Sequence, residues 1–99
     1  MARQSVTALA YSKKGQLLSI GHNSYTKTHT LQAKLAHKAN EPHKIYLHAE
    51  LDALLKARHP VHTLKIFRVN AKGEYVNAAP CPICRLAIAH FGVKKIIHT

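Results

Sequence analysis

The sequence has no tryptophan, two cysteines, four acidic residues, four glycines and four prolines. Two cysteines are too few for a disulfide-based extracellular scaffold. The longest purely apolar runs have about four residues, far short of the roughly 18 that a membrane-spanning helix requires. Residues 1–5 lack the apolar core of a signal peptide, which predicts a cytoplasmic chain. A membrane protein, a secreted protein and a multidomain enzyme are therefore excluded.

A length of 99 residues predicts one small domain that covers residues 1–99. A domain of this size has a thin core, because it buries only about two thirds of the surface of its unfolded chain. A bound metal ion or a partner subunit would add to its stability.

The chain is strongly basic, because 15 Lys and Arg residues stand against four Asp and Glu residues and give a formal net charge of +11. This charge favours partners that carry phosphate, either nucleotides or nucleic acid. The lysines are spread along the chain without a run longer than two, which is equally typical of a solubilising surface. The charge alone therefore indicates a class of partner and no site.

The first half of the chain predicts a β-hairpin followed by two helices. Short strands at residues 6–11 and 16–20 flank a turn that contains Gly15. Leu31 and Leu35, at helical spacing, predict a short helix that residues 40–42 end. Leucines spaced as in an amphipathic helix then begin at residue 47 and stop before Pro60.

The second half predicts a strand–helix–strand unit. The strands are residues 61–69 and 93–98, and the apolar helix between them is residues 83–91. A turn and a short extended segment at residues 70–77 precede the helix. Such a unit implies two parallel strands, so that the hairpin makes the sheet mixed. The sequence predicts an α/β fold, a three-layer sandwich with helices against a mixed sheet.

Cys81 and Cys84 form a CxxC motif in the segment PCPIC. A disulfide framework fails on the number of cysteines and on the compartment. A structural zinc ribbon would need a second ligand pair at short spacing, and no such pair exists. A redox-active pair at a helix start and a three-ligand zinc site with an open position both stay open. The CxxC motif alone does not separate these two.

The segment His48-Ala49-Glu50 at the start of the leucine-rich helix favours the zinc site. Side chains in a first helical turn reach past the helix end, so that two helix N-termini could point at one spot. One would carry His48 and Glu50, and the other both cysteines. One histidine and two thiolates leave the fourth tetrahedral position of zinc to water, as in catalytic sites. Zinc lowers the pKa of that water to about 7, and Glu50 could carry its proton.

Together, H-x-E and P-C-x-x-C form the motif pair of zinc deaminases, and the chain resembles the cytidine deaminase superfamily from its hairpin to its last strand. The resemblance implies a cytidine deaminase-like α/β/α sandwich in a minimal, C-terminally short version. It implies Zn²⁺ held by His48, Cys81 and Cys84, with Glu50 as the catalytic proton shuttle. It further implies that Asn23 contacts the sugar or the base and that backbone atoms of Ala49 meet the amino edge of the base. Asn23 is equally a common residue at a strand end.

The implied reaction is hydrolytic deamination of a cytosine nucleotide such as dCMP or CMP. Zinc-bound hydroxide attacks C4, Glu50 moves the proton to the ring nitrogen and then to the leaving amine, and ammonia departs. The alternatives are a deaminase of cytosine or adenine in single-stranded DNA or RNA, and a catalytically silent zinc-binding module. The charge supports a strand substrate, whereas the few aromatic residues disfavour it.

Departures from the family's usual pattern affect the substrate and the assembly. The turn before the PCPIC segment and the missing asparagine after Glu50 make the chain less like the mononucleotide enzymes. Family members also commonly have a further strand and helix after the strand predicted at residues 93–98. Without them an apolar sheet edge or helix face would be exposed to solvent. Burial of that surface by a second copy of the chain predicts a homo-oligomer.

Overall fold

The computed structural model describes residues 5–99, which form five strands and three helices. The elements are β1 Ser5–Tyr11, β2 Leu17–His22, α1 Thr30–Lys38, α2 Ala49–Lys56, β3 Thr63–Val69, β4 Tyr75–Val76, α3 Pro82–His90 and β5 Lys95–His98. Each predicted strand and helix is present, with ends shifted by a few residues. The predicted hairpin turn is confirmed, because Gly15 lies between β1 and β2 with φ +85°.

The strand β3 is the centre of a mixed sheet. On one side it pairs antiparallel with β1, which pairs antiparallel with β2. Its other side pairs parallel with β5 along residues 63–66 and antiparallel with β4 at Arg68 and Val69. The parallel pair and the mixed sheet predicted from the sequence are confirmed.

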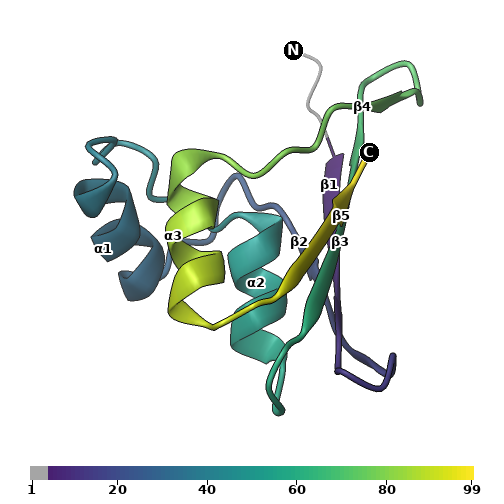
Figure 1. The fold of residues 1–99 in the computed structure, drawn as a ribbon. Helices are drawn as coiled ribbons and strands as arrows, with labels where there is room; N and C mark the ends of the chain where they lie inside the picture. Colours follow the sequence, from purple (N-terminus) through teal and green to yellow (C-terminus); the bar gives the residue numbers. More distant parts are fainter. Residues whose placement is uncertain (1–4) are drawn as a thin grey trace.

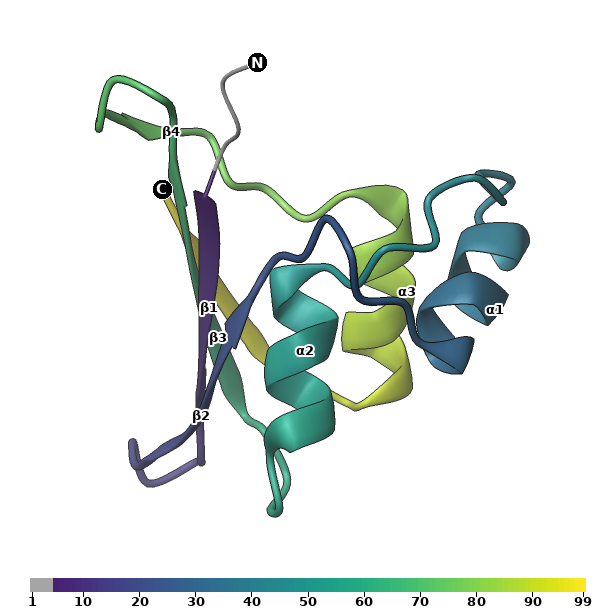
Figure 2. The same cartoon turned by 180° about the vertical axis from the view of Figure 1, so that it is seen from behind.

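All three helices lie on the same side of the sheet, as both views of the ribbon show (Figures 1 and 2). From the sheet outward the order is α2, α3 and α1 (Figures 1 and 2), because α2 contacts β1 and β2 whereas α3 contacts α2 and α1. The third layer therefore lies behind the other two helices and not across the sheet. Leu35 and Ala36 of α1 are buried, and α1 contacts α3.

Small residues bring α2 close to the sheet. Ala8 and Ala10 of β1 are fully buried beneath the helices. A Cβ added to Gly21 of β2 would overlap the carbonyl oxygen of Ala49 and the amide nitrogen of Ala53 in α2. Backbone atoms of a helix cannot move aside as a flexible side chain can. Position 21 therefore requires glycine for space, and it sets the height of α2 above the sheet.

Polar contacts fix α2 along the edge strand β2. The Asp52 carboxylate accepts a hydrogen bond from the His22 backbone N–H at 3.0 Å, and it pairs with Lys56 at 2.9 Å. The Ser19 hydroxyl donates to the Ala53 carbonyl at 2.6 Å. These bonds hold the first turn of α2 at the end of β2, where the candidate site lies.

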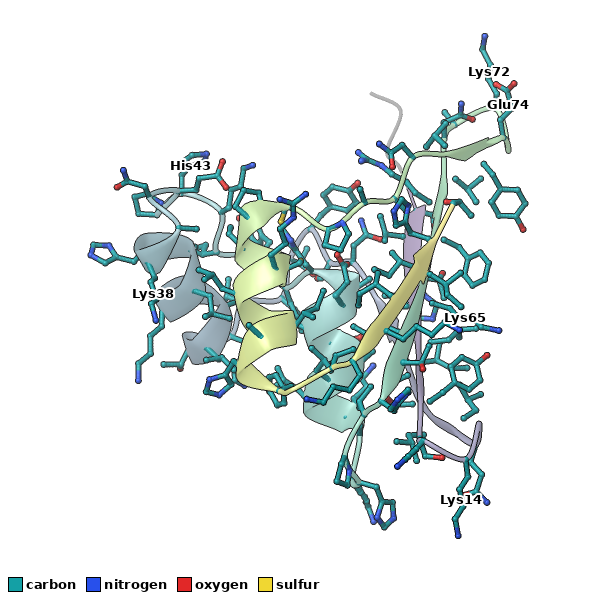
Figure 3. All side chains as sticks on the ribbon, in the orientation of Figure 1. Lys14, Lys38, His43, Lys65, Lys72 and Glu74 are labelled. Atoms are coloured by element: carbon teal, nitrogen blue, oxygen red, sulfur yellow. The ribbon has the colours of Figure 1, made fainter. Side chains whose placement is uncertain are left out.

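The other face of the sheet carries side chains that point away from the helices. Ala8, Leu64 and Ile66 are buried on the helix side, so that the residues alternating with them lie on the outer face. Lys65 extends outward there (Figure 3). The exposed large apolar side chains of the strands are Leu17, Ile20, Tyr75 and Ile97. Among the described residues, no helix has the length and apolarity that a membrane span needs.

We expect Gly21→Ala to destabilise the protein by roughly 1–3 kcal/mol, the usual cost of overpacking, and to weaken metal binding by displacing α2. Gly15→Ala is the matched control, because a Cβ there meets nothing within 4 Å and only its positive φ opposes the change. Urea unfolding of both variants measures the difference. A Gly21→Ala variant at least as stable as Gly15→Ala would contradict the close approach.

Candidate metal centre

His48 is the residue that begins α2. It is the N-cap, with extended backbone angles of φ −82° and ψ 155°, and its side chain makes no capping bond. Its backbone N–H donates to the Gln32 Oε1 at 3.3 Å, and the Gln32 Nε2 donates to the Lys44 carbonyl at 3.3 Å. Gln32 is fully buried in α1. One side chain of α1 therefore orders the segment that delivers His48.

Cys81 begins α3 in the same way. It is the N-cap, and Pro82 follows in the first helical turn. Proline suits this position, because the amide hydrogen that it lacks would have no partner within the helix. Cys84 lies in the first turn and is 1% exposed, whereas Cys81 is partly exposed. The predicted arrangement of one ligand group on each of two helix starts is confirmed.

His48, Cys81 and Cys84 meet between the two helices. The His48 Nδ1 lies 3.2 Å from the Cys84 Sγ and 3.5 Å from the Cys81 Sγ. The three donor atoms all lie within 4.8 Å of one another. Tetrahedral zinc, with bonds of about 2.0 Å to nitrogen and 2.3 Å to sulfur, separates its ligands by roughly 3.5–3.8 Å. The donor set and its spacing fit a zinc ion with a fourth position left for another ligand.

The electrostatics of the three groups favour a cation. The hydrogen bond from the Cys84 thiol, followed by the one from His48, lowers the pKa of Cys81 to about 3 despite its burial. The hydrogen bond between His48 and Cys81 is also the main reason why the pKa of His48 is raised. The same pairing with Cys81, and then burial, raises the pKa of Cys84 well above its ordinary value. Zinc ligation replaces such shared protons with one metal ion.

Glu50 lies beside this cluster, in the first turn of α2, and is 6% exposed. Its charge contributes, after the larger effect of Cys81, to the raised pKa values of His48 and Cys84. The carboxylate is thus close enough to act on His48 and Cys84. A buried acid at this place is available to hold or pass a proton.

A cavity of about 290 Å³ opens beside the cluster. The residues that line it are Val6, Asn23, Lys44, His48, Ala49, Glu50, Arg68, Ala78, Ala79 and Cys81. Five of the six residues predicted from the sequence are in this lining, and Cys84 lies buried behind it. All six are thereby brought to one place.

Asn23 also has a structural role in the lining. Its Oδ1 accepts a hydrogen bond from the Val6 backbone N–H at 2.9 Å, and its own N–H donates to the Val6 carbonyl at 3.2 Å. These bonds continue the β1–β2 pairing past the end of β2. Asn23 is therefore held at the wall of the cavity by the sheet.

Sequence reasoning missed two cationic residues of the lining, Lys44 and Arg68, and the supporting residues Gln32 and Asp52. The signal for Arg68 was present, because Leu64, Ile66 and Arg68 alternate along one face of a strand. A cationic residue that follows buried apolar residues on the same face of a strand indicates that a polar site lies at the edge of the core.

Comparison with known proteins gives one family. The family described as "Cytidine and deoxycytidylate deaminase zinc-binding region" matches residues 2–99. Among curated proteins, none matches the chain.

Two solved structures have a similar fold. The dCMP deaminase of the cyanophage S-TIM5 is 27% identical, with a TM-score of 0.55 over 94% of this chain and 64% of that one. A mutant cytidine deaminase from Mycobacterium tuberculosis is 21% identical, with a TM-score of 0.53 over 97% of this chain and 68% of that one. This chain thus spans about two thirds of each. The predicted α/β cytidine deaminase-like fold and the predicted zinc cofactor are confirmed.

We expect His48→Gln to lower the affinity for zinc by at least about 100-fold, since even the residues that support a ligand contribute 10- to 100-fold. The matched control is His90→Gln, at the opposite end of α3, where the histidine is exposed. Elemental analysis after dialysis and competition with a chromogenic chelator measure both variants. Equal zinc content in the two would refute the assignment of His48 as a ligand.

Proposed function

Because the chain belongs to the cytidine and deoxycytidylate deaminase family, we propose that it is a zinc-dependent hydrolase that deaminates a cytosine nucleotide of the dCMP or CMP type. One observation carries this proposal: a buried carboxylate, Glu50, lines the same cavity as two of three clustered metal donors. A purely structural zinc site has no need of that carboxylate.

The metal donors in the proposal are His48, Cys81 and Cys84. When bound, zinc supplies the Lewis acidity that makes water a nucleophile at neutral pH. The two helix N-termini add their partial positive charge, which stabilises the thiolates.

Glu50 is the proposed proton carrier. It accepts one proton from the attacking water and delivers it to the ring nitrogen of cytosine, and it then passes the second proton of that water to the amine at C4. Water adds to C4, the bond from C4 to the amine breaks, and ammonia and a uracil nucleotide are the products. The low exposure of Glu50 keeps bulk water away from these transfers.

Asn23 and Ala49 complete the proposed site. Asn23, fixed by its two bonds to Val6, would contact the sugar or the base. Ala49 is fully buried at the first position of α2 and lines the cavity, where backbone atoms would meet the amino edge of the base.

The size and lining of the cavity support a mononucleotide. Its volume of about 290 Å³ is at the lower end of the range of ligand sites. No phenylalanine or tyrosine is among the described residues that line it, whereas single-stranded nucleic acid is usually held by stacking on such rings. The similar cyanophage protein is described as a dCMP deaminase. Deamination of a base in a strand is the second candidate, and only the basic charge favours it.

Ammonia release from the zinc-loaded protein tests the function. The substrates are dCMP, CMP, deoxycytidine, cytidine, the adenine and guanine counterparts, and a cytosine-containing single strand, each in low and moderate salt. We expect turnover of a free cytosine nucleotide with weak dependence on salt. Turnover of the strand alone, falling steeply with salt, would establish the second candidate instead.

We expect Glu50→Gln to keep zinc and fold and to lower turnover by about 10²- to 10⁴-fold, the usual contribution of a proton-transferring side chain. Glu74→Gln, an exposed change of the same kind in the turn before β4, is the control. Steady-state kinetics together with the zinc content separate lost chemistry from lost metal. Undiminished turnover in Glu50→Gln would end the assignment.

We also propose that the protein acts in the cytoplasm, where its thiolates stay reduced, and as a homo-oligomer. Exposed apolar side chains on the outer face of the sheet, such as Ile20 and Ile97, are candidates for the contact between copies. Light scattering should give a mass above 11.0 kDa, and Ile20→Lys should lower it. A uniform monomer would contradict the oligomer.

A further inference from the structure

Beyond the metal donors and Glu50, the cavity contains two cationic side chains, Arg68 and Lys44. They come from the end of β3 and from the segment before α2, so that the fold brings together two cations from distant parts of the sequence. Neither belongs to the HAE or PCPIC motif. Their presence in the lining favours a ligand that carries an anionic group.

Arg68 is held firmly by its backbone. It pairs with Val6 of β1 on one side and with Val76 of β4 on the other, and its N–H donates to the Thr99 hydroxyl at 3.1 Å. Because Leu64 and Ile66 are buried on the helix side, alternation places the Arg68 side chain on that side as well. The sheet therefore presents the guanidinium to the cavity at a fixed place.

The Arg68 side chain has unused hydrogen-bonding capacity. Its Nε is buried and has no hydrogen-bond partner within residues 5–99. No carboxylate of those residues lies within 4.0 Å of its guanidinium, since the ion pairs found there are Lys44–Glu41 and Lys56–Asp52. A buried donor without an acceptor is unfavourable unless a ligand supplies the acceptor.

Lys44 differs from Arg68 in both respects. Its Nζ lies 3.1 Å from a Glu41 carboxylate oxygen, and its side chain is 41% exposed. Its charge is therefore partly balanced and sits at the rim of the cavity, whereas Arg68, with its Nε buried, has no carboxylate partner among the described residues. Lys44 can attract an anion, and Arg68 can bind it.

We propose that Arg68, assisted by Lys44, binds the phosphate of a mononucleotide substrate and so makes the enzyme prefer a nucleotide to a nucleoside. The planar guanidinium matches two phosphate oxygens at once, which a lysine cannot do. The cavity places this phosphate site in the same space as the metal donors and Glu50. The inference rests on the proposed function and names the group of the substrate that the cations recognise.

Four other lysines lie outside this cavity. Lys14, Lys38, Lys65 and Lys72 extend from the hairpin turn, from α1, from the outer face of β3 and from the turn before β4 (Figure 3). They point away from one another and are not in the cavity lining. Lys13, Lys65 and Lys95 line a separate cavity that contains none of the metal donors, so that the phosphate preference is assigned to Arg68.

The test compares dCMP with deoxycytidine as substrates of the zinc-loaded enzyme. In Arg68→Met, the ratio of kcat/KM for dCMP to kcat/KM for deoxycytidine should fall about 10- to 100-fold, mainly through KM for dCMP. Arg68→Lys should restore part of the ratio. Arg58→Met, which removes an exposed arginine just beyond the end of α2, should keep the parental ratio. An unchanged ratio in Arg68→Met, or an equal loss on both substrates, would overturn the proposal.

A binding measurement separates this inference from the deaminase function. Calorimetry with zinc-loaded Glu50→Gln protein should give a dissociation constant for dCMP that Arg68→Met raises by the same 10- to 100-fold. Such a result with no turnover in the parent would retain the phosphate site and refute the deaminase. Turnover with equal affinity for dCMP and deoxycytidine would retain the deaminase and refute the phosphate site. A loss of affinity in Arg68→Met that is seen only with a cytosine-containing single strand would also refute the phosphate site for a mononucleotide.

Discussion

The close approach of α2 to β2 at Gly21 is the contact on which the site depends. It fixes the height of the helix above the sheet, while Ser19 and the Asp52 carboxylate fix its position along the edge strand. Because His48 and Glu50 occupy the first turn of that helix, the sheet sets their position directly. Asn23 immediately follows the same strand, so that one edge of the sheet orders both the helix that carries His48 and the wall of the cavity at Asn23.

The second helix start adds two thiols to the histidine and the carboxylate of the first. Cys81 and Cys84 lie so close together that the hydrogen bond between them, aided by the one from His48, lowers the pKa of Cys81 to about 3, and the pairing with Cys81 raises the pKa of Cys84. Two thiols so near each other cannot both ionise without a counter-charge. A divalent cation supplies it and ties two helices together across a small core. In this chain the cofactor is thus expected to serve stability as well as chemistry.

The parts that the sequence predicted share one property, which is that their signals are local. The leucines of α2, the turn at Gly15 and the pair of motifs around His48 and Cys81 each depend on neighbours within a few positions. Arg68, Gln32 and Lys44 gain their roles only when β3, α1 and the segment before α2 meet. The placement of α1 behind α3 is likewise a matter of packing between helices (Figure 1). No spacing rule within one segment predicts such contacts.

The net charge of the chain and the cations of the cavity act over different distances. The net charge therefore does not predict where the cations of the cavity lie. Exposed lysines are screened within about 8 Å at physiological ionic strength, so that they raise the rate of encounter with any phosphate without selecting one. Arg68, whose Nε is buried, is screened less, and its backbone is held at one place by β1 and β4. In the proposed phosphate role, discrimination between a nucleotide and a nucleoside would depend on this one cation of the cavity. The +11 charge of the surface would favour a nucleotide and a strand alike.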